Sequence, residues 1–209
     1  MEYTRCSQPI RWLEITAVIA TGLLFLVSRY LRLQGLFVPV AAAFWISFVL
    51  YRARGDWRVL RAWGFRLDTL RPAFGAATAF SLPIVGAMAL VAFRRRALSF
   101  PTHGLILLAL YPVWGVVQQF LVQALLVQNL ERSLPRYGLI LIGSCLFAVV
   151  HIPELPLMLA TFGLGLVYVP LYLHYRNLWP LGLYHGWLGT FFYLWVLGRD
   201  PWVETFARF

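Results

Sequence analysis

The sequence predicts an all-α fold, a polytopic bundle of transmembrane helices that forms a single domain over residues 1–209. Two observations of composition and one of pattern predict it. Of the 209 residues, 61% are hydrophobic and 12% are charged, and the mean hydropathy is +0.73. Long apolar stretches recur along the whole chain, with no soluble-looking block or Ser/Gly-rich linker between them. A soluble core of this size cannot bury so much apolar surface, so the composition requires lipid as solvent.

The individual elements follow from the length of the apolar stretches. A bilayer core of about 30 Å needs roughly 20 helical residues to cross. On that rule we expect about seven spans, at residues 15–31, 36–51, 73–93, 104–130, 137–152, 157–175 and 178–197. The first stretch is too long for a cleavable signal peptide and lacks a small-residue cleavage site, so we expect it to be a span.

Charge gives the expected orientation. The formal net charge is +10, but the arginines form short clusters between apolar stretches, as at 94–96, rather than one basic face, which argues against nucleic acid as a partner. Segment 52–71 mixes arginines with Trp57 and Trp63 and is predicted to be amphipathic and interfacial. Because more arginines lie on the side of the N-terminus, we expect a plasma (inner) membrane location with a cytoplasmic N-terminus, although the cluster at 94–96 opposes it.

Polar side chains at membrane depth are the candidate functional residues, because they cost free energy in hydrocarbon. Gln118, Gln119 and Gln123 lie in the fourth predicted span, where positions 119 and 123 share one helix face. His151 ends the fifth span and His185 lies in the seventh. We expect these amides and imidazoles to face one another and to hold water or polarise a carbonyl. The alternative is that they are hydrogen-bonding contacts between helices.

These residues resemble the motifs of the CPBP family of intramembrane proteases, also called the CAAX-processing and bacteriocin-processing or ABI family. Its members carry E-E-x-x-x-R, then F-x-x-x-H, then H-x-x-x-N/D on successive transmembrane helices. Here Phe147-Ala-Val-Val-His151 matches the second motif, and residues 163–185 resemble the glycine-bearing helix, polar turn and Trp-Pro entry that lead to the third. The resemblance covers roughly residues 104–198.

The chain departs from the family at the charged positions of the motifs. It reads Gln118-Gln119-Phe-Leu-Val-Gln123 where the family has Glu, Glu and Arg, and Gly189 stands where an Asn or Asp is expected. In the family, a Glu activates water, the histidines position it or transfer protons, and the Asn helps to stabilise the oxyanion. Gln can orient water but cannot accept its proton, and losing a general base typically costs about 10²–10⁴-fold in rate.

Two residue types can compensate for the lost base. Imidazole titrates near neutral pH, so His151 or His185 is one candidate. Glu154, three residues after His151, is another, although a carboxylate beside Pro153 is more often simply solvated. A zinc site built on two histidines lacks a third ligand, so we expect no metal and no cofactor.

Two functions follow from the resemblance, and a third class is disfavoured. The first is an intramembrane endopeptidase that acts on a membrane-embedded or membrane-proximal peptide. The second is a pseudoprotease that keeps the cavity and binds or chaperones a membrane or lipidated client. A transporter would be expected to show an internal repeat, and none is evident. The expected partners are the lipid bilayer and a peptide or protein, as substrate or client.

Overall fold

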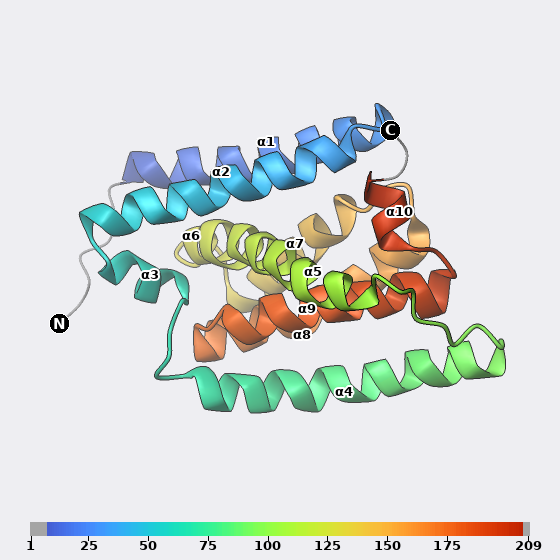
Figure 1. The fold of residues 1–209 in the computed structure, drawn as a ribbon. Helices are drawn as coiled ribbons and strands as arrows, with labels where there is room; N and C mark the ends of the chain where they lie inside the picture. Colours follow the sequence, from blue (N-terminus) through green and yellow to red (C-terminus); the bar gives the residue numbers. More distant parts are fainter. Residues whose placement is uncertain (1–7, 207–209) are drawn as a thin grey trace.

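The structure is a computed structural model that describes the backbone of residues 8–206 and the side chains of residues 12–206. These residues form helices only (Figure 1). The elements are α1 (Gln8–Tyr30), α2 (Gln34–Gly55), α3 (Arg58–Trp63), α4 (Leu70–Arg94), α5 (Gly104–Gln119), the π-helix η1 (Phe120–Val127), α6 (Gln128–Leu130), α7 (Arg136–Val149), α8 (Leu155–Tyr175), α9 (Trp179–Phe191), the π-helix η2 (Phe192–Leu197) and α10 (Pro201–Phe206).

Five helical stretches are long and apolar enough to cross a membrane, at Trp12–Tyr30, Gln34–Gly55, Leu70–Arg94, Gly104–Leu130 and Leu155–Tyr175. The shorter apolar helix α7 has 14 residues, and α9 has 13 before the chain passes into η2. The expected all-helical membrane fold is therefore confirmed, whereas the expected count of about seven spans is not.

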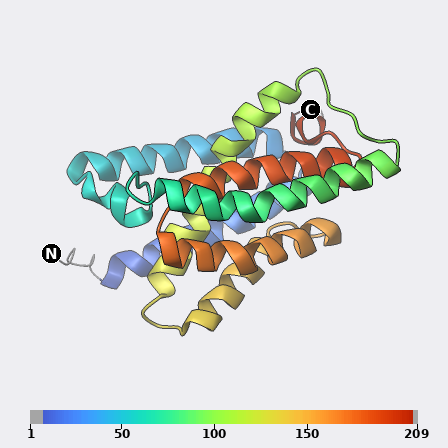
Figure 2. The same ribbon diagram turned by 90° about the horizontal axis from the view of Figure 1, so that it is seen from below.

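The helices pack around a central antiparallel contact between α5 and α9 (Figure 1). Helix α4 runs along α9, and α7 and α8 form a hairpin on one flank (Figure 2). Helices α1 and α2 form a second hairpin, and many of their large apolar side chains point outward, among them Leu23 and Phe44, each 59% exposed. Exposed apolar faces of this extent are typical of surfaces that contact lipid.

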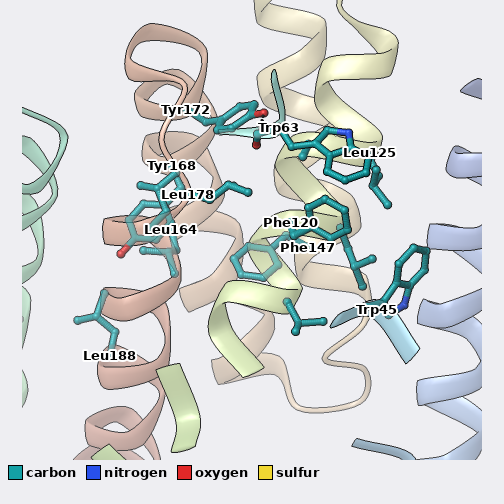
Figure 3. Packing of buried hydrophobic residues seen from close by; sticks show 14 of the residues in the cluster. Trp45, Trp63, Phe120, Leu125, Phe147, Leu164, Tyr168, Tyr172, Leu178 and Leu188 are labelled. Atoms are coloured by element: carbon teal, nitrogen blue, oxygen red, sulfur yellow. Dashed lines mark hydrogen bonds between the residues drawn. The ribbon is translucent and has the colours of Figure 1, made fainter. Parts of the chain in front are cut away.

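The core contains aromatic side chains from distant parts of the chain (Figure 3). The Phe120 ring lies 5.1 Å from that of Trp63 and 6.2 Å from that of Trp45, centroid to centroid. The segment 52–71 is amphipathic, as predicted, but Val59 and Trp63 of α3 are buried in the protein, and Trp57 faces outward with 67% exposed. The packing of α3 therefore fixes one end of the bundle.

Candidate active site

The close crossing of α5 and α9 brings together two of the predicted site residues, Gln118 and His185. It depends on glycines whose missing side chains would collide with the opposite helix. A Cβ on Gly115 would lie 2.3 Å from the carbonyl oxygen of Gly182, and one on Gly186 would lie 2.5 Å from the backbone nitrogen of Pro112. Because the two backbones approach so closely, Gln118 on α5 and His185 on α9 lie within hydrogen-bonding distance.

The hydrogen bond between Gln118 and His185 fixes the orientation of both groups. Gln118 Oε1 and His185 Nε2 are 2.9 Å apart. An amide oxygen only accepts hydrogen bonds, so Nε2 carries the imidazole proton and donates it. The Nδ1 atom of His185 is then the unprotonated nitrogen, and it is buried without a partner among the described residues. The Gln118 oxygen is thereby held by the imidazole, and the amide NH₂ is directed away from that contact.

His151 lies in the turn that follows α7, where a backbone carbonyl sets its tautomer. Its Nδ1 lies 2.9 Å from the carbonyl oxygen of Phe147 and 3.4 Å from the hydroxyl of Thr161. A carbonyl oxygen accepts, so Nδ1 is the protonated nitrogen and donates to it. The opposite nitrogen, Nε2, is left with a free lone pair. The Phe147 ring contacts both imidazoles, with centroid distances of 6.0 Å to His151 and 4.9 Å to His185.

A cavity of about 490 Å³ connects these groups. Gln118, His151 and His185 all line it, and its volume lies within the range that small ligand sites occupy, about 300–1,000 Å³. The walls come from α1, α2, α5, the turn after α7, α8, α9, η2 and α10. The cavity is thus formed by segments from both halves of the chain.

Two carboxylates also line the cavity, and both are held by one arginine. Arg199 pairs with Glu154 at 3.0 Å and with Glu204 at 2.9 Å. The hydrogen bond to Glu204, with that to Glu154, raises the pKa of Arg199 above its usual value despite partial burial. Glu154, which the sequence suggested as a replacement carboxylate, is therefore in the cavity, where it shares Arg199 with Glu204. Arg199 and Glu204 were not singled out from the sequence, because charged residues near a span end resemble ordinary interfacial groups.

Gln119 and Gln123 lie apart from this cavity. Both are buried in the core, with 0% and 1% exposed, and Gln123 Nε2 donates to Gln119 Oε1 at 3.1 Å. The remaining polar atoms, Gln119 Nε2 and Gln123 Oε1, have no partner among the described residues. The expected pairing of positions 119 and 123 on one face is found. The expected single constellation of amides and imidazoles is instead divided into two groups.

Gly189 faces the cavity one turn after His185. A Cβ built there would meet no atom within 4 Å, so the site has room for a side chain. The surrounding atoms would thus allow a polar side chain at this position, although the sequence has glycine there. Within residues 12–206, no three His, Cys, Asp or Glu side chains gather closely enough to hold a metal ion.

The fold and the cavity define a polytopic helical membrane protein with a polar site enclosed between its helices. Residues 99–191 match the family model described as type II CAAX prenyl endopeptidase Rce1-like. The segment from α5 to α9 is therefore similar to this family, in agreement with the resemblance to CPBP proteases. No curated protein and no solved structure matches the chain. The family suggests a CAAX-type intramembrane endopeptidase, and it implies a bilayer environment and peptide or protein substrates.

Proposed function

We propose that the chain is an endopeptidase-like protein that binds a membrane-embedded or membrane-proximal peptide in the cavity, with His151 as general base. The observation that carries the proposal is the hydrogen bond from His151 Nδ1 to the Phe147 carbonyl oxygen, 2.9 Å long. It leaves Nε2 as the basic nitrogen in a cavity where the family position for a carboxylate holds Gln118. Imidazole is the side chain best suited to accept a proton near neutral pH.

The remaining groups supply complementary roles in this mechanism. A water molecule attacks the scissile carbonyl carbon while His151 Nε2 accepts its proton. The Gln118 amide NH₂, oriented by the 2.9 Å bond between its oxygen and His185, donates to the carbonyl oxygen as negative charge develops there. His151 then returns the proton to the leaving nitrogen as the C–N bond breaks. In this scheme His185 is a positioning residue for Gln118.

The test is cleavage of a panel of prenylated and unprenylated transmembrane peptides by the purified protein in nanodiscs. His151→Ala is expected to lower the rate by about 10²–10⁴-fold, the usual contribution of a general base. His174→Ala is the matched control, because the His174 imidazole is exposed at the end of α8 and does not line the cavity. Cleavage that survives in His151→Ala at the parental rate would rule out His151 as the base.

A second candidate function is a pseudoprotease that binds or chaperones a membrane or lipidated client. The observation that favours it is the pairing of both cavity carboxylates, Glu154 and Glu204, with Arg199. Among the described residues, no carboxylate lines the cavity apart from these two. This candidate predicts that the parent cleaves nothing, and that a Gln118→Glu variant gains cleavage. Parental cleavage that depends on His151 would exclude it.

The proposal includes an orientation in the plasma (inner) membrane with the N-terminus in the cytoplasm. The arginine-rich segment 52–71 lies at the same end of the bundle as the loop between α6 and α7, which contains Arg132 (Figure 1). Arg176 pairs with Glu131 of that loop. This asymmetry favours that end as cytoplasmic. The cavity is lined at the other end, by Arg29, Gln34 and α10, so a client segment would be bound near the extracytoplasmic face.

Labelling with a membrane-impermeant maleimide tests this orientation. Single cysteines would replace Ser133 and Ser99, which lie at opposite ends of the bundle, in a background where both native cysteines are changed to Ala. We expect labelling of position 99, and not 133, in intact cells. The opposite pattern would invert the orientation and place the cavity on the cytoplasmic side.

A further inference from the structure

A second cavity lies beside the first, on the face of α1 that packs against α7 and η1. It has a volume of about 140 Å³, and its walls include Val18, Gly22, Phe25, Leu121 and Val150. We refer to it as the α1 groove. Among the residues with described side chains, polar groups in its wall come from Thr21, Gln118 and the Trp114 indole, and the Thr21 hydroxyl already donates to the carbonyl oxygen of Ala17 at 2.8 Å. A peptide backbone would find almost no hydrogen-bonding partner there, whereas a hydrocarbon chain would lose nothing.

The groove opens toward lipid and borders the larger cavity. Ile19 and Leu23 on its rim are 45% and 59% exposed on the outer face of α1, where acyl chains surround the protein. Phe25, Trp114 and Gln118 line both cavities and separate them. A chain that enters the groove from the bilayer would therefore lie directly against the wall of the candidate active site.

Two arginines follow the residues that line the groove, at the C-terminal end of α1. Val18, Gly22, Phe25 and Arg29 follow one another at helical spacing, so they form a single stripe along α1. Arg29 Nη1 donates to the carbonyl oxygen of Ile152 at 3.1 Å, and no carboxylate partner is found for it among the described residues. Arg32, just beyond the helix end, also lines the larger cavity. Both arginines thus lie in the wall of the larger cavity, which shares Phe25 with the groove.

We propose that this site binds an anionic phospholipid, with the phosphate on Arg29 and Arg32 and one acyl chain in the α1 groove. The dimensions agree with a lipid that stays in its leaflet. From Val18 to Arg29 the helix rises about 16 Å, close to the hydrocarbon depth of one leaflet, about 15 Å. Guanidinium groups bind phosphate oxygens in a bidentate manner, which makes them suited to this headgroup. The lipid completes the wall of the site beside Phe25 and Trp114.

Native mass spectrometry of the full-length protein in detergent tests the proposal, with dioleoyl phosphatidylglycerol and dioleoyl phosphatidylcholine titrated separately. We expect tighter retention of phosphatidylglycerol. The Arg29→Gln/Arg32→Gln variant should weaken it by about fivefold for each arginine, roughly 25-fold in total. The control Arg94→Gln/Arg96→Gln removes the same charge from exposed positions at the same end of the bundle, and it should change retention less than twofold.

A second variant addresses the acyl chain. Ile19→Trp at the groove rim fills the groove from a partly exposed position and should weaken binding of both lipids. Equal retention of the two lipids by the parent, or an equal loss in the control pair, would overturn the proposal. Displacement of phosphatidylglycerol by a farnesylated peptide with a free carboxylate would also overturn it, because the groove would then belong to the client. Lipid retention is measured without any cleavage, so its failure is separate from a failure of the proposed function.

Discussion

Gly186→Ala should separate α5 from α9 and break the contact between Gln118 and His185. A Cβ at this position would lie 2.5 Å from the backbone nitrogen of Pro112, 2.6 Å from its Cα and 2.6 Å from the carbonyl carbon of Tyr111. All three are backbone atoms of α5, which cannot rotate away as a flexible side chain would. The helices must therefore move apart.

The size of the movement follows from these distances. Ordinary carbon contacts lie at about 3.5–4.0 Å, so the two backbones must separate by roughly 1 Å at the crossing. That displacement would lengthen the 2.9 Å hydrogen bond between Gln118 and His185 beyond a useful distance. Overpacking of this kind costs typically about 1–3 kcal/mol. For a chain of this length, that corresponds to a decrease in Tm of about 2–12 °C.

Thermal unfolding in detergent, followed by tryptophan fluorescence, measures this effect. Gly189→Ala is the matched control, since it adds the same methyl group three residues further along α9 where no atom lies within 4 Å. We expect its Tm to match that of the parent. If Gly186→Ala melts at the same temperature as Gly189→Ala, the close crossing does not exist as described and the derivation of the site fails.

Three further predictions concern the cavity and the arginine-rich end. Arg199→Gln removes the ion pairs to Glu154 and Glu204, which should lower the local stability of α10 by about 1.4 kcal/mol. Local unfolding of α10 should then be roughly tenfold more frequent, and limited proteolysis measures its rate. Gly189→Asn should leave Tm unchanged, because the site is open, and in a Gln118→Glu background it should raise peptide cleavage by about 10²–10³-fold by supplying an oxyanion donor. Hydrogen bonds from Arg66 lower the pKa of Asp68, so Asp68 stabilises the fold at neutral pH. The parent should therefore have a higher Tm than Asp68→Asn at neutral pH. This difference in Tm should shrink only as the pH falls below about 4, the usual pKa of the carboxyl group. A difference that stays constant down to pH 2 would contradict this last prediction.

The fold class could be predicted from the sequence because hydropathy is averaged over some 20 residues, and this average survives local irregularity. The number of spans could not be fixed in the same way. The fourth predicted stretch, 104–130, contains the π-helix η1, and the last one divides into α9 and η2. Whether such interrupted or short helices cross the bilayer depends on packing against neighbours, which the apolar content of one segment does not encode.

The candidate site was only partly predictable for a related reason. Sequence spacing placed Gln119 and Gln123 on one face, and their hydrogen bond has this spacing. It could not show that Gln118 faces the cavity while its neighbour Gln119 points into the core, because that depends on how α5 rotates against α9. Arg199 contacts Glu154 across 45 positions of sequence, and no local pattern indicates such a contact.

The buried pair Gln119 and Gln123 provides a last test of how this site departs from its family. By resemblance, these positions would carry a Glu and an Arg, which together form a neutral unit. Replacing one member alone leaves an uncompensated buried charge, at a cost of about 3–5 kcal/mol, whereas replacing both removes the charge altogether. This difference in cost favours a pair in which both charges are absent, such as the two buried amides, which are 0% and 1% exposed.

Restoring one charge alone should therefore destabilise the fold, whereas restoring both together should cost much less stability. We expect Gln119→Glu and Gln123→Arg each to lower the free energy of unfolding by several kcal/mol, with the arginine variant the worse of the two because guanidinium cannot lose its proton inside the protein. The double variant should recover most of that loss, so that its destabilisation is far below the sum of the single effects. Additive effects would mean that the two side chains, now 3.1 Å apart, do not form one unit, and that the loss of charge at these positions arose independently.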